Sequence, residues 1–129
     1  MAYRKSRWRI ELSNDNIKPL YEKRIETFQI LLEATKKGRV EWEKLGEDGF
    51  VAQPSKLAVS AVREYLPEVG AVFYVNVTNN AGSPVDQFSI NHEDMDLFDC
   101  MKELFVAARQ DIDRRVGQNL DELVESLRA

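Results

Sequence analysis

The chain contains one cysteine and one histidine, and this scarcity excludes several kinds of chemistry. Because Cys100 is the only cysteine, neither an intramolecular disulfide nor a thiolate metal cluster can form within one chain. The single histidine, His92, excludes the HExxH zinc motif. Neither a Walker loop nor a GxGxxG phosphate-binding turn occurs in the sequence. The sequence therefore indicates none of the enzyme classes that these motifs mark.

Long apolar runs are also missing. No apolar stretch approaches the roughly 20 residues that a membrane-spanning helix needs. Residues 1–9 are basic, but no apolar stretch follows them, so we expect no secretory signal. The 129 residues are 43% hydrophobic and 31% charged, which is typical of a globular protein with one core. We expect a single cytoplasmic domain over residues 1–129.

A helix, a glycine and a strand follow one another in the first third of the chain. Apolar residues recur every three or four positions from Ile17 to Thr35, which places them on one helix face. Gly38 can adopt the left-handed conformation that ends a helix. The pattern predicts a helix over residues 17–37 and a strand over Val40–Leu45 that carries Trp42 into the core.

Further strands are predicted where apolar and polar residues alternate or β-branched residues cluster. These segments are Arg7–Leu12, Phe50–Gln53, Lys56–Tyr65, Ala71–Thr78 and Val85–Ile90. The segment Lys56–Tyr65 leaves two alternatives open. Its alternation favours a strand, but Ser55 could cap a helix that holds Leu57, Ala61, Val62 and Tyr65 on one face. We take the strand.

The last third of the chain has helical periodicity. An apolar stripe runs from Leu97 to Ile112, in a helix that we expect Asn91 to open. Gly117 is expected to end that helix, and Asn119 with Glu122 predicts a capping box for a short C-terminal helix. The sequence thus predicts an α+β fold: an antiparallel sheet of about four to six strands, with two long helices packed on one face.

His92 and Asp96 are the weak candidates for metal ligands. On one helix they would share a face, but a site needs a third or fourth ligand that the sequence does not supply. Cys100 would lie about 12 Å from His92 on such a helix, too far for a nucleophile and its base. It falls on the apolar stripe, where we expect a core residue. We therefore expect no catalytic residue, metal or cofactor.

Cations and aromatic residues alternate near the N-terminus, a texture typical of nucleic-acid contacts. The cations are Arg4, Lys5, Arg7 and Arg9. On an edge strand, however, such charges also prevent unwanted strand pairing. The formal net charge of −4 further weakens the case for a nucleic-acid partner.

Each catalytic arrangement considered lacks a member, so the sequence favours a non-enzymatic role. We expect a protein–protein interaction or regulatory protein, of an accessory or anti-defence type, with a homodimer as one form. Trp42 and Arg109 join the N-terminal cations as interaction candidates. Two alternatives remain: a nucleic-acid-binding protein that uses the N-terminal basic strand, and a small-ligand binder or enzyme with a pocket at the helix–sheet junction near Trp42 or His92. We expect no membrane partner.

Three short elements carry a resemblance to other proteins: Leu31–Gly38 followed by Trp42, Glu103–Arg109, and Leu120–Leu123. Together they resemble a loose group of small bacterial and phage-associated proteins to which no activity is attached. In that group an N-terminal helix, an A-T-x-x-G-x-x-x-W run, a β-meander and a C-terminal helix follow in this order. The resemblance covers roughly residues 20–127 and implies a strand at Lys56–Tyr65. It also implies that Arg109 extends toward the sheet or Trp42.

Overall fold

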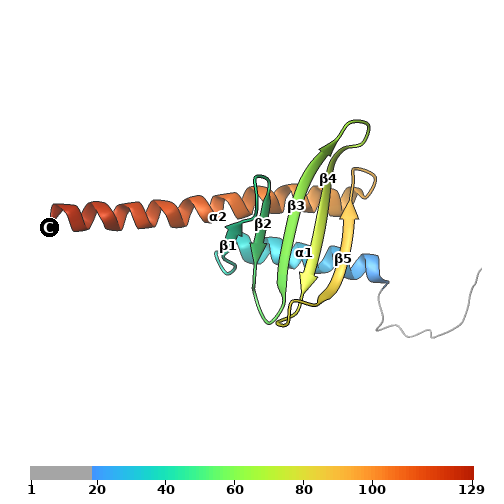
Figure 1. The fold of residues 1–129 in the computed structure, drawn as a ribbon, viewed down its shortest axis with the longest axis horizontal. Coiled ribbons are helices and arrows are strands. Elements are labelled where there is room, and N and C mark those ends of the chain that lie inside the picture. The colour runs from blue at the N-terminus through green and yellow to red at the C-terminus, as the bar shows by residue number, and fades with distance from the viewer. Residues whose placement is uncertain (1–18) are drawn as a thin grey trace, which may run out of the picture.

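The protein folds into one five-stranded sheet and two helices (Figure 1). The structure is a computed structural model, and it describes residues 19–129. The elements in chain order are α1 (Leu20–Lys36), β1 (Trp42–Lys44), β2 (Gly49–Ala52), β3 (Ala58–Leu66), β4 (Gly70–Thr78), β5 (Pro84–Ile90) and α2 (Met95–Arg128). The predicted strand Arg7–Leu12 lies outside the described residues.

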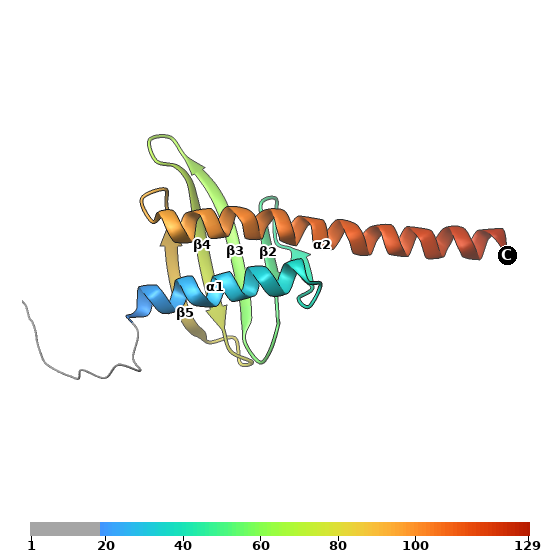
Figure 2. The same cartoon turned by 180° about the vertical axis from the view of Figure 1, so that it is seen from behind.

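The sheet is a meander in which each strand pairs antiparallel with the next, in the order β1-β2-β3-β4-β5. Both helices lie on the same face of this sheet (Figures 1 and 2). The α+β class and the antiparallel sheet are therefore confirmed. The strand at Lys56–Tyr65 is confirmed as well, because β3 pairs along its whole length with β4, from Ala58 opposite Thr78 to Leu66 opposite Gly70.

The core fills the space between the helices and the sheet. Alternate side chains of the strands enter it, including Phe50 of β2 and Phe73 of β4, both 1% exposed or less. The ring of Phe105 from α2 meets both of these rings edge to face, at centroid distances of 5.1 and 5.0 Å. Phe28 of α1 and Met101 of α2 are also fully buried. Burial of these side chains holds the helices on the sheet.

Gly38 ends α1 as predicted. Its φ of 75° is in the left-handed region. Its N–H donates to the carbonyl of Thr35 at 3.0 Å, and the N–H of Arg39 donates to the carbonyl of Ala34 at 2.9 Å. This pair of bonds is a Schellman motif, which satisfies the last carbonyls of the helix and turns the chain toward β1.

The two helices differ from their predicted lengths. The first is 17 residues, Leu20–Lys36, so it is not the long helix expected over residues 17–37. The second begins at Met95 and not at Asn91. The Asn91 side chain accepts a hydrogen bond from the N–H of Glu93 at 2.8 Å, and this local turn competes with the helix. His92 therefore precedes the helix, and the shared helical face predicted for His92 and Asp96 does not form.

The predicted end of α2 at Gly117 and the separate C-terminal helix are wrong. The helix is continuous through Gly117 for 34 residues, so Asn119 and Glu122 are interior helical residues and form no capping box. A glycine inside a helix costs only about 1 kcal/mol relative to alanine. Gly117 is not among the described glycines with positive φ. The surrounding helix formers therefore outweigh it.

Trp42 is a core residue, as predicted, and its indole is anchored to α1. The ring is 1% exposed. Its Nε1–H donates to the Thr35 hydroxyl oxygen at 3.0 Å, and that hydroxyl donates to the Leu31 carbonyl at 2.8 Å. The buried indole N–H of Trp42 is therefore satisfied, and β1 is joined to the last turn of α1.

We expect Thr35→Val to destabilise the protein by about 2 kcal/mol, because the buried indole N–H would lose its acceptor. Thr35→Ser keeps the hydroxyl and loses one methyl group, so it should cost only about 1 kcal/mol. Urea unfolding followed by tryptophan fluorescence measures both. A Thr35→Val variant that is as stable as Thr35→Ser would contradict the assigned hydrogen bond.

Candidate interaction surface

A buried carboxylate fixes α2 where it passes the edge strand β1. Asp111 of α2 is 1% exposed, and its Oδ2 accepts a hydrogen bond from the backbone N–H of Trp42 at 3.0 Å. Arg114 and Arg115, one turn further along α2, bind the same carboxylate at 2.6 and 2.9 Å. Arg115 also donates to the carbonyl of Trp42. We call these four residues the Asp111 cluster.

The Asp111 cluster keeps its carboxylate ionised. Burial alone would raise the pKa of Asp111, but the Trp42 N–H, Arg115 and Arg114 outweigh it and hold the pKa below its usual value. A buried charge is tolerated only when it is paired and hydrogen-bonded, as it is here. The cluster therefore sets the direction in which α2 leaves the sheet.

Beyond the Asp111 cluster, α2 extends past β1 into open space (Figures 1 and 2). We call residues 113–128 the projecting segment. Its 16 residues span about 24 Å at the helical rise. No side chain of the projecting segment is buried in the described structure, and every residue from 118 onward is exposed. The C-terminal half of the helix thus has no partner within residues 19–129.

The projecting segment carries an apolar stripe. Five large apolar side chains in it are between 44% and 77% exposed. They are Val116, Leu120, Leu123, Val124 and Leu127. Four of them follow one another at intervals of four, three and four residues, the spacing that aligns side chains on one helix face.

This stripe lies beside the buried face of the same helix. Its four aligned side chains fall within roughly 60° of Phe105 around the helix axis, whereas the buried Ala108 is roughly 120° from Leu120. Lys102, which lies five turns before Leu120 on the same side of the helix, is exposed. The stripe therefore runs along the edge of the core face and over the side of α2 that is exposed in the first half as well.

Other large exposed apolar side chains in the described part of the chain are scattered. Examples are Ile30 of α1, Tyr65 of β3, Val85 of β5 and Met95 at the start of α2, each more than half exposed. Single exposed apolar residues of this kind are common on protein surfaces. An aligned row along a projecting helix is not, and such contiguous apolar surfaces mark interaction sites.

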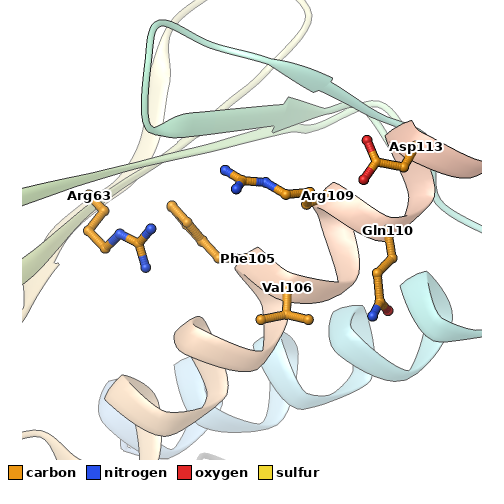
Figure 3. Close-up of a pocket in the computed structure, with 6 residues that line it drawn as sticks. All are labelled: Arg63, Phe105, Val106, Arg109, Gln110 and Asp113. Carbon is orange, nitrogen blue, oxygen red and sulfur yellow. The ribbon is translucent and has the colours of Figure 1, made fainter. Parts of the chain in front are cut away.

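A separate pocket of about 290 Å³ lies between α2 and β3 (Figure 3). Its lining residues are Arg63, Phe105, Val106, Arg109, Gln110 and Asp113. Arg63 is held by a two-bond ion pair to Asp48 at 2.8 and 3.0 Å, with its guanidinium 5.1 Å from the centre of the Phe105 ring. The pocket is at a helix–sheet junction, as one alternative predicted, but neither Trp42 nor His92 lines it.

Arg109 extends toward the sheet, one of the two directions that the resemblance implied. Its guanidinium lies 5.9 Å from the centre of the Phe50 ring of β2. Within residues 19–129 it has no acidic partner. Trp42 is instead contacted by Arg115, which the sequence did not single out. Among the described residues, Arg109 therefore presents an unpaired cation at the pocket.

The remaining candidates form no site. His92 and Asp96 are exposed, and the described chain contains no group of three or more His, Cys, Asp or Glu that could hold a metal ion. Cys100 is buried, as predicted, and burial raises the pKa of its thiol to about 11. The thiol therefore stays protonated near neutral pH. Arg4, Lys5, Arg7 and Arg9 lie outside the described residues.

We expect Asp111→Asn to lower the free energy of unfolding by about 1–3 kcal/mol at pH 7, because the arginines lose their buried counter-charge. The folded-state pKa of Asp111 is depressed, so its ionised form stabilises the fold above the unfolded pKa of about 4. This stabilisation is lost as the pH falls through the folded-state pKa.

The difference between wild type and Asp111→Asn should therefore shrink below about pH 4, which urea unfolding at several pH values measures. Asp113→Asn changes an exposed carboxylate two residues away and serves as the control. An equal difference at neutral and acidic pH would contradict the assigned charge.

No helix in residues 19–129 is both long and apolar enough to cross a membrane. Comparison of the chain with protein-family models, with curated proteins and with solved structures found no match. The resemblance to the group of small bacterial and phage-associated proteins therefore stays a prediction.

Proposed function

We propose that this chain is a protein–protein interaction module that binds its partner through the projecting segment. The observation that carries the proposal is the apolar stripe of Val116, Leu120, Leu123 and Leu127, which has no covering element among the described residues. Amphipathic helices bind partners by burying such a stripe in an apolar groove or against another helix.

The packed first half of α2 keeps the projecting segment helical before a partner binds. An isolated helix of about 16 residues is only marginally stable in water. Here the Asp111 cluster and the core residues hold the preceding turns, so the projecting segment does not have to nucleate its own helix. A preorganised helix loses less conformational entropy when it binds a partner. An accessory or regulatory role, without catalysis, agrees with this arrangement.

Two expectations from the sequence stay predictions beside this proposal. Nucleic-acid binding through Arg4, Lys5, Arg7 and Arg9 depends on residues outside the described range. A cytoplasmic location was expected from the sequence and also stays a prediction.

We expect Leu120→Glu to abolish protein binding, because it places a charge at the centre of the apolar stripe. Gln118→Glu adds the same charge on the opposite face of the same helix and should bind like wild type. The immobilised full chain, with nuclease present, is used to capture proteins from host lysate, and mass spectrometry compares the three forms.

Circular dichroism shows whether each variant keeps the helix. A set of captured proteins that is identical for wild type and Leu120→Glu would contradict the proposal. If Gln118→Glu also fails to capture these proteins, the added negative charge, and not the loss of the apolar stripe, would explain the loss of binding.

A second candidate function is the binding of a small carboxylate or phosphate compound in the Arg63–Arg109 pocket. The observation that favours it is the guanidinium of Arg109, which has no acidic partner among residues 19–129 and shares the pocket with that of Arg63 (Figure 3). Guanidinium groups form charge-assisted hydrogen bonds with such anions. Asp113 lines the same pocket and would favour ligands that also carry a cationic or donor group.

A panel of small carboxylates and phosphates should contain a compound that raises the melting temperature, since a ligand at about 100 times its Kd adds roughly 2.7 kcal/mol to stability. Arg109→Gln should remove this effect. Arg128→Gln, which removes a cation at the far end of α2, should keep it. A shift that survives Arg109→Gln would exclude this pocket as the site.

A further inference from the structure

We propose that the Arg63–Arg109 pocket binds a free α-amino acid with an apolar side chain, held by both its carboxylate and its ammonium group. This inference depends on the second candidate function, the binding of a small anionic compound in this pocket, and it names the class of ligand. It does not depend on the projecting segment.

The charged side chains at the pocket leave one cation and one anion available to a ligand. Arg63 is already neutralised, because its guanidinium donates two hydrogen bonds to the carboxylate of Asp48, at 2.8 and 3.0 Å. Arg109 and Asp113 have no charged partner within residues 19–129. A phosphate dianion would therefore meet one available cation and a repelling carboxylate, whereas a zwitterion matches both charges.

Arg109 and Asp113 are about one turn apart on α2, but they do not pair with each other. Their positions differ by about 6 Å along the helix axis, and a cation four residues before an anion is the weaker order for such a pair. The guanidinium of Arg109 lies instead 5.9 Å from the centre of the Phe50 ring, and it points away from the carboxylate of Asp113 (Figure 3). The two charged groups thus line one pocket without a direct ion pair between them.

An α-amino acid has the size to bridge these two groups. Its carboxylate oxygens and its ammonium nitrogen are about 3 Å apart, and a hydrogen bond of about 2.8 Å at each end extends its reach to about 8–9 Å. The carboxylate would accept hydrogen bonds from Arg109, and the ammonium group would donate to Asp113. A carboxylate without an amino group leaves Asp113 without a partner, and an amine leaves Arg109 without one.

The rest of the pocket offers apolar surface for the side chain of the amino acid. Val106 lines the pocket and is 59% exposed, and the ring of Phe105 lies beside it. Contact with Val106 would remove apolar surface from water. The volume of about 290 Å³ is at the lower end of the range for ligand pockets, so it suits a ligand the size of one amino acid.

The pocket is open to solvent, which sets the expected affinity. Arg109 and Asp113 are both exposed, and exposed charge pairs are weak because water and salt screen them. We therefore expect phenylalanine to bind with a dissociation constant of about 1 mM. Loss of one charged contact should raise that constant about fivefold.

Nuclear magnetic resonance titration of the isotope-labelled full chain tests the class of ligand. The probes are phenylalanine and three compounds that share its ring. 3-Phenylpropanoate lacks the ammonium group, 2-phenylethylamine lacks the carboxylate, and phenyl phosphate carries a dianion. Phenylalanine should shift the amide resonances of the pocket residues and bind about five times more tightly than each of the other three compounds.

Two variants separate the roles of the charged groups. Asp113→Asn should remove the preference for phenylalanine over 3-phenylpropanoate, because only the ammonium contact is lost. Arg109→Gln should weaken the binding of both carboxylates and should not weaken that of 2-phenylethylamine. Glu125→Gln removes an exposed carboxylate near the C-terminal end of α2 and should bind all four compounds like wild type.

The outcomes separate the amino-acid ligand from the function on which it depends. If 3-phenylpropanoate or phenyl phosphate binds the pocket as tightly as phenylalanine, the amino-acid inference is overturned while the binding of a small anion stands. An Asp113→Asn variant that keeps the full preference also overturns it. If phenylalanine, leucine and methionine all leave the pocket resonances unshifted at about 20 mM, the inference is overturned, and the second candidate function then depends on the broader panel of anions.

Discussion

The structure depends on the anchoring of one residue, Trp42, by both helices. The Thr35 hydroxyl of α1 receives its indole N–H, and Asp111 of α2 receives its backbone N–H. Each contact satisfies a buried polar group, so removal of either would leave a desolvated donor. Because Trp42 also begins β1, the edge strand and the two helices are fixed relative to one another at this point. The direction of the projecting segment follows from that constraint.

The consequence is a molecule in which one helix serves two purposes. Over residues 95–112, α2 contributes Phe105, Met101 and Leu104 to the core. Over residues 113–128, no side chain is buried by the described part of the chain, and an apolar stripe is exposed. The described residues contain no group of three or more His, Cys, Asp or Glu that could hold a metal ion, and the raised pKa of the buried Cys100 thiol keeps it protonated near neutral pH.

Sequence patterns within a few residues predicted those elements whose conformation the same few residues determine. Gly38 was predicted to end α1 because glycine can adopt a positive φ. The alternation of apolar and polar residues identified β3 as a strand, although a helix was the alternative. Local rules failed at Gly117, where the cost of one glycine was outweighed by helix formers on both sides. The sequence did identify Leu120, Leu123, Val124 and Leu127 as an apolar face, but assigned it to a separate short helix. The Asp111 cluster could not be predicted, because its three α2 residues are 69 or more residues from Trp42 in sequence and meet it only in the folded chain.

The central claim is that the exposed stripe of α2 is a binding surface and not a frayed end. Amide hydrogen exchange of the purified full chain, measured alone and with the proteins that it captures from host lysate, tests it most directly. The account predicts that residues 113–128 exchange more slowly when a captured protein is bound, while residues 95–112 are protected equally in both samples. Equal exchange of residues 113–128 with and without the captured proteins would contradict the account.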